Sequence, residues 1–456
     1  MNLARLLKQR ADSARPVRVG LIGAGKFGSM FLAQLRTTPG LHLIGIADLS
    51  VDRAAAALAR TGWDVNAARA GSFTAALRDG TTMLTDDAGA LIAAEGLDVV
   101  VEATGSPAAG ARHALAAIAA GRHVVMVTVE ADVLVGPLLA RRAREAGVVY
   151  GMAYGDQPAL VCEMVDWARA CGFSVVAAGK GTKYLPAFHA STPDTVWQHY
   201  GLTPEQAAQG GMNAQMFNSF LDGTKSSIEM AAIANAAGLA APADGLLFPP
   251  CGVDDLARVL RPRAAGGLLE RAGMVETVSS LERDGRPVFR DLRWGVYVVF
   301  EAEEGPPGDY ARACFREYGV LTDPSGRYTA LYRPYHLIGL ELGISVASAA
   351  LRGEPTGVAE AFNADVVAVA KRPLKAGEML DGEGGFTVWG KTLPAATSLA
   401  RGGLPIGLAH GVSLTRDIAA GEIVGWSDVR IADSDIVRLR REMEAAFAPA
   451  PGTPAG

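Results

Sequence analysis

The sequence predicts an α/β protein with three parts: a doubly wound parallel sheet, an α+β substrate domain and a small β module. Three observations lead to this prediction. Apolar runs of strand length alternate with helical stretches over residues 1–155, a glycine-rich loop joins the first run to a helix, and a short pattern repeats near the C-terminus. A chain of 456 residues has room for about three domains, which agrees with this division.

The composition restricts the class of protein. With 49% hydrophobic and 20% charged residues, the chain is not a disordered one. Its 43 basic and 48 acidic residues give a net charge of −5, which argues against a nucleic-acid partner but leaves room for a local basic pocket. The four cysteines form no C-x-x-C pair, and no apolar run reaches the ~18 residues of a membrane helix. We therefore expect a soluble, cytoplasmic protein without disulfides or a membrane partner.

The elements of residues 1–155 follow from their apolar periodicity. Residues 1–15 form a short amphipathic helix that lacks the apolar core of a signal peptide. Helices such as 29–35 and 109–120 separate the strands, and residues 61–83 look like an irregular insertion. The predicted strands are 17–22, 41–47, 98–103, 123–128 and 148–153. Strands that alternate with helices in this way form a parallel sheet with helices on both faces.

The glycine-rich loop is the strongest chemical signal. Gly23, Gly25 and Gly28 form a G-x-G-x-x-G pattern around Lys26 and Phe27, directly after the first strand and at the start of a helix. The first glycine permits a tight turn, the second lets the backbone approach a pyrophosphate, and the third allows helix and strand to pack closely. This context predicts a Rossmann domain that binds a dinucleotide.

The choice between NAD and NADP stays open. Asp48 ends the second strand, 20 residues beyond Gly28, where a carboxylate accepts hydrogen bonds from the adenine ribose and favours NAD. Ser50 and Arg53 follow closely and could serve a 2′-phosphate instead, although Arg53 also fits a solvated helix position.

The ends of the next two strands supply further candidate cofactor contacts, because the carboxyl ends of parallel strands line the ligand crevice. Thr104, Gly105 and Ser106 follow one strand, and Thr128 and Glu130 follow the other. Glu130 fits equally well as an acidic residue at a helix N-terminus.

Residues 156–361 are predicted to form the substrate domain. Strands are expected at 173–178 and 294–301, and helices at 213–237 and 334–351. The first of these helices carries polar residues three and four apart on one face, namely Asn218, Asp222, Lys225, Ser226 and Glu229. Lys225, paired with Asp222, could stabilise an alkoxide or move a proton. The alternative is a surface ladder of ion pairs.

Other cations of this domain suit an anionic substrate. Lys180 and Lys183 lie in a predicted glycine-rich loop after a strand, which fits a phosphate or carboxylate but also a plain solvated loop. Arg333 could clamp an anion, and His336 could donate to phosphate or act as an acid or base, although a structural histidine is also consistent. No histidine or cysteine cluster indicates a metal, whereas Asp156, Asp222 and Glu229 leave a magnesium site open. Asp156, at the domain junction, could contact substrate or belong to a hinge.

The C-terminal part contains an internal repeat. Residues 370–379 match residues 414–423, each copy follows a short strand, and each places Ala-Gly-Glu at a turn. This pattern predicts a small pseudo-symmetric β module over residues 362–435, which packs on the catalytic region, builds an oligomer or covers the site. Residues 436–456 are expected to form a helix and a flexible tail that begins at residue 448.

Several of these motifs resemble a known group. Residues 22–28, 46–50, 154–158 and 222–226 resemble homoserine-dehydrogenase-like oxidoreductases, and the C-terminal module resembles the SAF domain, a β-clip unit. The combination, over residues 17–431, is similar to the second type of 1-deoxy-D-xylulose 5-phosphate reductoisomerase-like enzymes.

The resemblance implies an NADPH-dependent conversion of that substrate to 2-C-methyl-D-erythritol 4-phosphate in isoprenoid-precursor synthesis. It implies that Lys180, Lys183, Arg333 and His336 hold phosphate or oxyanion, with Lys225 near the reacting carbon and with help from a divalent cation, Mg or Mn. The alternatives are a homoserine or related hydroxy-acid dehydrogenase, or a non-catalytic nucleotide-sensing or carbohydrate-binding protein. In either enzyme reading the partner is a small anionic substrate, and we expect a homo-oligomer.

Overall fold

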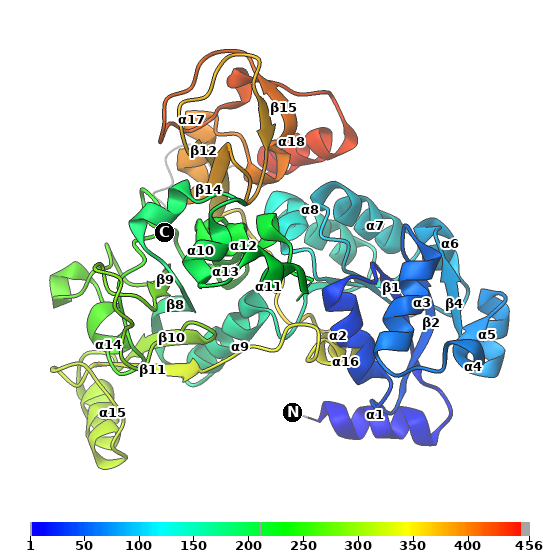
Figure 1. Cartoon of the computed structure of the whole chain (residues 1–456). Coiled ribbons are helices and arrows are strands. Elements are labelled where there is room, and N and C mark those ends of the chain that lie inside the picture. Colours follow the sequence, from blue (N-terminus) through cyan, green and yellow to red (C-terminus); the bar gives the residue numbers. More distant parts are fainter. Residues whose placement is uncertain (1, 210, 448–456) are drawn as a thin grey trace. The chain divides into compact units, whose positions relative to one another are not determined.

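The computed structural model describes residues 2–209 and 211–447, which form two compact units (Figure 1). The first unit extends to Leu160 and also contains Leu337–Glu360, and the second contains Val161–His336 and the chain from Ala361 onward. The predicted flexible tail, residues 448–456, lies outside the described residues.

The first unit is built on a seven-stranded parallel sheet in the order β3-β4-β2-β1-β5-β6-β7, which confirms the predicted doubly wound fold. Since β1 lies between β2 and β5, the sheet order reverses beside it, and such switch points are where ligands bind. The strands are β1 (Val17–Ile22), β2 (Leu41–Ala47), β3 (Arg69–Ala70), β4 (Thr82–Thr85), β5 (Val99–Glu102), β6 (His123–Met126) and β7 (Tyr150–Met152).

Helices cover both faces of this sheet. Val19 and Leu21 of β1 pack with Phe31 and Leu58 in a core formed by α2, α3 and α16. On the other face, Gly20 of β1 lies against Leu91 of α6. Figure 1 shows α7 beside α8. The helices are α1 (Leu3–Asp12), α2 (Lys26–Leu35), α3 (Val51–Arg60), α4 (Val65–Ala68), α5 (Phe73–Asp79), α6 (Ala88–Ala93), α7 (Pro107–Ala119), α8 (Val129–Glu145) and α16 (Gly343–Arg352).

Two segments of this unit differ from the prediction. Residues 61–83 are not an irregular insertion, because they contain α4, β3 and α5 and lead into β4. This strand lies between the edge strand β3 and β2, and it is too short and too polar to give an apolar run. The helix expected at 334–351 begins only at Gly343. Gly339 interrupts the segment with φ +80°. A Cβ atom at this position would lie 2.6 Å from Met30 Cβ, so only glycine fits there. This helix packs in the first unit.

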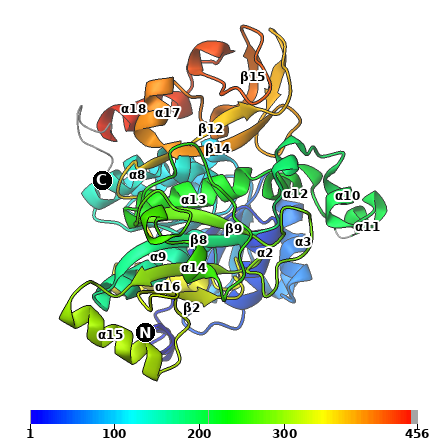
Figure 2. The same ribbon diagram turned by 90° about the vertical axis from the view of Figure 1, so that its left-hand side faces the viewer.

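The second unit contains a mixed four-stranded sheet in the order β11-β10-β8-β9, in which β8 and β9 are parallel and the other pairs antiparallel. Helix α13 packs along β8 and β9 (Figure 2). The strands are β8 (Ser174–Thr182), β9 (Met274–Ser279), β10 (Val296–Glu301) and β11 (Tyr328–Arg333). The helices are α10 (Val196–Tyr200), α11 (Pro204–Gln209), α12 (Ala214–Leu221), α13 (Thr224–Ala237), α14 (Leu256–Val259) and α15 (Pro306–Glu317), and α9 (Gln157–Ala170) crosses the boundary between the units.

The single helix expected at 213–237 is two helices. Helix α12 ends at Leu221 and α13 begins at Thr224. Gly223 between them has φ +91°, a left-handed conformation that other residues rarely adopt. The break changes which polar side chains share a helix face.

The C-terminal module has two small antiparallel sheets, β12-β14 and β13-β15-β16. Its repeat has the predicted pseudo-symmetry: Leu374 and Ile418 exchange backbone hydrogen bonds of 2.9 and 3.0 Å. Gly377 N likewise donates to Leu414 O, and Gly421 N to Ala370 O, both at 2.8 Å. The elements are β12 (Ala364–Ala370), β13 (Met379–Asp381), β14 (Val388–Pro394), α17 (Ala395–Arg401), β15 (His410–Leu414), β16 (Val429–Arg430) and α18 (Asp435–Phe447).

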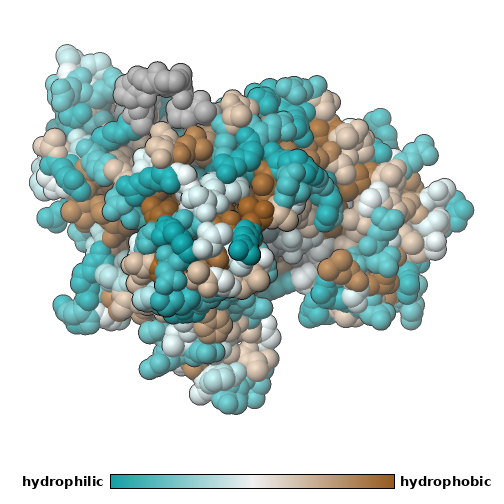
Figure 3. Space-filling view, turned by 90° about the horizontal axis from the view of Figure 1, so that it is seen from above, coloured by the Kyte–Doolittle hydropathy of each residue, from teal (hydrophilic) through white to brown (hydrophobic). Residues whose placement is uncertain are grey.

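The surface in Figure 3 carries hydrophilic residues over much of the visible face, with hydrophobic residues in smaller groups between them. Within residues 2–209 and 211–447, no helix combines the length and the hydropathy that crossing a membrane requires.

Candidate active site

The glycine-rich loop connects β1 to α2. Gly23 has φ +96°, and a Cβ there would lie 2.5 Å from Ala103 O. A Cβ on Gly28 would overlap Gly23 O, so the third glycine lets α2 pack against the loop. Gly25 caps the N-terminus of α2 and has open space where a side chain would be, next to the exposed Lys26 and half-buried Phe27. A helix N-terminus with this open backbone suits a phosphate group.

Asp48 is buried beneath this loop. Its Oδ2 accepts a 2.8 Å hydrogen bond from Ala24 N, and its Oδ1 accepts from Ser50 N at 3.0 Å and from Arg53 Nε at 2.8 Å. Burial opposes ionisation, but these hydrogen bonds outweigh it and lower the pKa of Asp48. Both carboxylate oxygens are thus engaged within the protein, and the half-exposed Arg53 side chain lies beside them.

The ends of β5 and β6 are joined by Glu102, which was not among the predicted site residues. Glu102 is fully buried, and its two oxygens accept 2.6 Å hydrogen bonds from the hydroxyls of Thr104 and Thr128. Thr128 Oγ1 in turn accepts from Gly105 N at 3.0 Å. The predicted Thr104, Gly105 and Thr128 therefore form one network around Glu102. The sequence feature that could have identified Glu102 is an acidic residue at the end of an otherwise apolar strand.

The remaining predicted residues of this region lie at helix starts. Ser106 caps α7 by accepting from Ala109 N, and Glu130 lies in the first turn of α8, as its structural alternative predicts.

In the second unit, the strand register gathers the predicted cations at one end of the sheet. Val296 of β10 lies opposite Lys180 of β8 on one side and Arg333 of β11 on the other. Directly paired residues point to the same face, so Lys180 and Arg333 share a face about 10 Å apart. Lys183 follows β8 at this end, and His336 follows β11 with Nδ1 2.8 Å from Trp294 O.

Lys180 belongs to β8 and not to the predicted loop. Side chains at Gly179 and Gly181 would overlap backbone atoms of Glu276 and Leu292, so the glycines allow close approach by neighbouring segments. The Lys180 ammonium is buried and forms an ion pair with Glu229 of α13. Lys225 lies one turn before Glu229 and is half-buried, which places it on the same helix face.

The sequence predicted that Asp222 pairs with Lys225, and this prediction is wrong. It is fully buried between α12 and α13, and its Oδ2 lies 2.8 Å from the ammonium of Lys371, which follows β12 of the C-terminal module. Burial raises the pKa of Asp222, and the neighbouring Lys371 opposes this shift only partly. The pairing could not be predicted because the two residues are distant in sequence.

Lys183 has a second cation beside it, Arg293, which the sequence analysis did not single out. The Lys183 ammonium lies 5.5 Å and the Arg293 guanidinium 5.7 Å from the ring centre of Tyr200. Burial and the charge of Arg293 lower the pKa of Lys183. Among the described residues, neither cation has a carboxylate partner. Two cations held together without an anion form a candidate anion-binding site.

The candidate magnesium residues do not form a metal site. Asp222 and Glu229 each face a lysine, and Asp156 Oδ1 accepts from Gln157 N at 2.9 Å. Over the described part of the chain, no group of three or more His, Cys, Asp or Glu side chains could hold a metal ion. The site geometry therefore assigns no ligands to the divalent cation that the resemblance implies.

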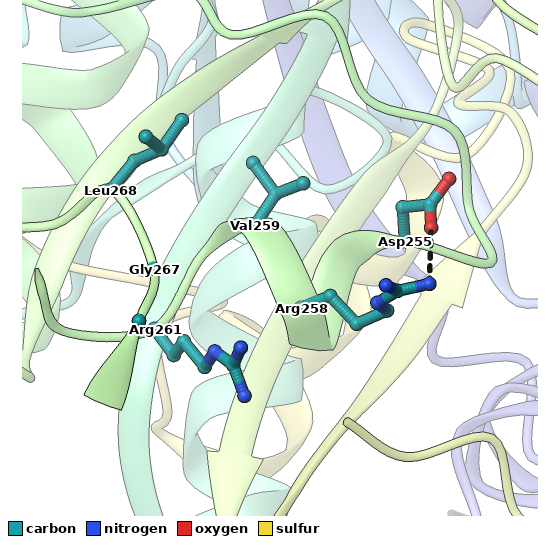
Figure 4. Close-up of a pocket in the computed structure, with 7 residues that line it drawn as sticks. Asp255, Arg258, Val259, Arg261, Gly267 and Leu268 are labelled. Carbon is teal, nitrogen blue, oxygen red and sulfur yellow. Dashed lines mark ion pairs between the residues drawn. The ribbon is translucent and has the colours of Figure 1, made fainter. Parts of the chain in front are cut away.

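A pocket of about 400 Å3 opens near α14 (Figure 4). It contains the Asp255–Arg258 ion pair at 3.8 Å, with Val259, Arg261 and Leu268 around it. None of the predicted site residues lines it. We place the candidate active site by its chemistry, at the sheet end with Lys180 and Lys183.

Three parts of the sequence match protein-family models. Residues 23–150 match the NAD-binding domain of homoserine dehydrogenase, residues 155–342 match the catalytic domain of the oxidoreductase DRL, and residues 365–430 match the SAF domain. No curated protein sequence matches the chain.

Solved structures show low overall similarity. An NAD-binding oxidoreductase from Klebsiella pneumoniae is 21% identical, over 37% of this chain and 43% of that one, with a TM-score of 0.28. A probable dehydrogenase from Thermotoga maritima is 15% identical over 75% and 91% of the two chains, with a TM-score of 0.39. Biliverdin reductase from Synechocystis, solved with biliverdin and NADP+, is 22% identical over 42% and 55%, with a TM-score of 0.27. The match thus spans less than two thirds of the first and third of these chains.

Proposed function

Since the chain is an NAD(P)-dependent oxidoreductase with a DRL catalytic domain between an NAD-binding domain and a SAF domain, we propose that it acts on a small phosphorylated hydroxy-keto substrate. The specific reaction we propose is the reductive isomerisation of 1-deoxy-D-xylulose 5-phosphate to 2-C-methyl-D-erythritol 4-phosphate. The catalytic-domain match also means that the non-catalytic alternative was wrong.

The observation that carries the proposal is the pair of cations Lys183 and Arg293. Burial and, after it, the positive charge of Arg293 lower the pKa of Lys183, so the two cations repel each other at this position. A phosphate dianion would remove this repulsion, and a guanidinium can bind it through two parallel hydrogen bonds. The half-buried position beside Tyr200 would strengthen the attraction relative to an exposed site. A phosphorylated substrate explains why two such cations lie together.

Lys225 and Lys180 would serve the reacting end of the substrate. Lys225 lies in the first turn of α13, where the helix dipole adds positive potential, and its ammonium could donate to an oxygen that gains negative charge. Glu229 forms an ion pair with the buried Lys180 ammonium. When bound, the nicotinamide supplies the hydride, and in the proposed reaction a carbon-skeleton rearrangement comes before this reduction.

We propose NADP as the preferred cofactor. Asp48 holds the loop amide of Ala24 and the Arg53 side chain, so its oxygens are already occupied when a ribose arrives. Arg53, with a side chain 55% exposed, could turn to a 2′-phosphate. The Arg53→Ala variant should then raise the KM for NADPH about tenfold, the loss of one charge-assisted contact, and leave the KM for NADH within twofold. An equal change for both cofactors would contradict this assignment.

Purified protein is tested with NADPH, magnesium and 1-deoxy-D-xylulose 5-phosphate, and in parallel with homoserine and NAD+. We expect NADPH oxidation with the sugar phosphate. Its absence would refute the reductoisomerase reaction, and turnover of homoserine would favour the dehydrogenase alternative.

The anion site is tested separately by Arg293→Gln. We expect the KM for the phosphorylated substrate to rise at least tenfold and the KM for NADPH to stay within twofold. Arg290→Gln is the matched control, because Arg290 forms an ion pair with Asp254 at 2.8 Å on the same chain segment. If Arg293→Gln and Arg290→Gln had the same KM for the phosphorylated substrate, the assignment of the phosphate site to Arg293 would be wrong.

A further inference from the structure

We propose that the SAF domain is a working part of the catalytic site and that Lys371 is its positioning residue, which holds the N-terminus of α13 and with it Lys225. The inference rests on the proposed function in one respect, because it takes Lys225 as a group that faces the substrate. It gives the C-terminal module a role that neither its repeat nor its family match assigns.

Lys371 is anchored on the catalytic domain. Its side chain is 2% exposed, and its ammonium lies 2.8 Å from Asp222 Oδ2. The same group donates to Ser191 O at 2.8 Å and to Gly385 O at 2.7 Å. Two hydrogen bonds and one ion pair therefore hold this ammonium. A lysine buried with three fixed partners orders every segment that it contacts.

The second copy of the internal repeat forms the same turn contacts without a lysine at the position of Lys371. Arg372 and Arg416 occupy equivalent positions and bind Glu378 and Glu422 of the two turns, at 2.5 and 2.7 Å. At the position before each arginine, however, the first copy has Lys371 and the second has Thr415. Thr415 bonds only within the module, through Ser427 O and Asp428 O. The symmetry is broken at the side chain that reaches the catalytic domain.

Asp222 transmits this contact to α13. Its Oδ1 accepts a 2.8 Å hydrogen bond from Thr224 N, the first residue of α13, and its carbonyl oxygen accepts from His189 Nδ1 at 2.7 Å. Gly223 follows in its left-handed conformation, and Lys225 is the second residue of the helix. The direction in which α13 starts, and therefore the position of Lys225, depends on the buried Asp222–Lys371 pair.

Strand β14 of the module supports the same helix turn. Gly390 N donates to Thr224 Oγ1 at 2.8 Å, and Thr392 Oγ1 donates to Ser227 O at 3.1 Å. The Trp389 ring stacks on His189 with centroids 3.8 Å apart and planes 23° apart. Burial lowers the pKa of His189 and so favours the neutral form of the stacked ring. The module therefore contacts both the helix start and the residue that holds the Asp222 carbonyl.

The test uses four variants of the full-length protein. Lys371→Met removes the ammonium and keeps the aliphatic chain length, and Lys375→Met is the control, since Lys375 is exposed and pairs with Asp417 at 2.7 Å on the same module. Asp222→Asn removes the opposite charge with little change of shape. The double variant Lys371→Met/Asp222→Asn restores charge balance without restoring the bonds from Lys371 to Ser191 O and Gly385 O.

We expect Lys371→Met to lower kcat at least tenfold while the KM for NADPH stays within twofold, because the cofactor motif lies in the first unit. In the double variant, Tm should recover toward the native value and kcat should stay low. Recovery of kcat together with Tm would overturn the proposal, because it would show a purely structural role. If Lys371→Met does not fold, the double variant and Asp222→Asn still give this comparison. Native kcat in both folded variants would also overturn it.

A second measurement does not depend on the substrate. Competitive acetylation followed by mass spectrometry reports the reactivity of Lys225 relative to Lys375 in the same sample. We expect this ratio to change at least threefold in the double variant compared with the native protein. An unchanged ratio overturns the positioning role even if the enzyme turns over another substrate, whereas a changed ratio without any reductoisomerase activity leaves the positioning role and refutes the proposed reaction.

Discussion

Replacing Asp132 by asparagine should remove a pH dependence from the stability of the first unit. Asp132 lies in α8 with only 1% of its surface exposed, and its Oδ1 accepts a 2.9 Å hydrogen bond from Tyr150 of β7. Its Oδ2 has no hydrogen-bond partner among the described residues. Burial raises the pKa of this carboxyl to about 7, although the Tyr150 hydroxyl opposes the shift.

The direction of this pH dependence is set by whether the folded or the unfolded state binds the Asp132 proton more strongly. The unfolded chain releases it near pH 3.8 and the folded chain near pH 7, so the folded state binds more protons between these values and its stability falls as pH rises. A shift of about three pKa units corresponds to on the order of 4 kcal/mol, of which roughly 2.5 kcal/mol is lost between pH 5 and pH 8. Asparagine carries no such proton, so the variant should gain about this amount relative to the native protein over that range.

Hydrogen exchange read by mass spectrometry on peptides from α8 and β7 measures the local unfolding free energy, once the intrinsic pH dependence of exchange is subtracted. This local readout suits a chain of two units better than one global transition does. Asp52→Asn, at an exposed position in the first turn of α3, serves as the control. If the Asp132→Asn and native free energies ran parallel from pH 5 to pH 8, the reasoning about a buried protonated carboxyl would be refuted.

Two further predictions concern the close packing at the glycine-rich loop and a buried ion pair of the C-terminal module. Gly28→Ala places a methyl group against Gly23 O and should destabilise the first unit by roughly 2 kcal/mol, whereas Gly25→Ala enters open space and should weaken only cofactor binding. Exchange and cofactor titration measure both, and equal destabilisation would contradict the reading of the loop. Arg440 is fully buried with Asp365 at 2.7 Å, so Arg440→Met should destabilise the C-terminal module by about 3–5 kcal/mol in urea unfolding, and Arg440→Met/Asp365→Asn should recover part of this loss. No difference between the single and double variants would show that the charge pair is not the cause.

Local sequence patterns determined much of the fold. Strands β1 and β2 have the predicted limits, because each is a largely apolar run that ends at a residue of different character, Gly23 after β1 and Asp48 after β2. The repeat of the C-terminal module is equally local, since each copy carries its own turn and its own arginine–glutamate pair. The short strand β4 and the break at Gly223 escaped prediction, because their positions depend on neighbours that are distant in sequence.

The sequence by itself determined the dinucleotide loop, the three-part organisation and the identity of most candidate cations. Only the tertiary structure decided which charges meet. Spacing along a helix suggested that Asp222 serves Lys225, but the carboxylate pairs with Lys371 of the C-terminal module. Arg293, distant from Lys183 in sequence, lies beside it at the Tyr200 ring. The physical reason is that a helix pattern fixes neighbours only within about one turn, whereas a buried charge must be paired by whatever segment packs over it.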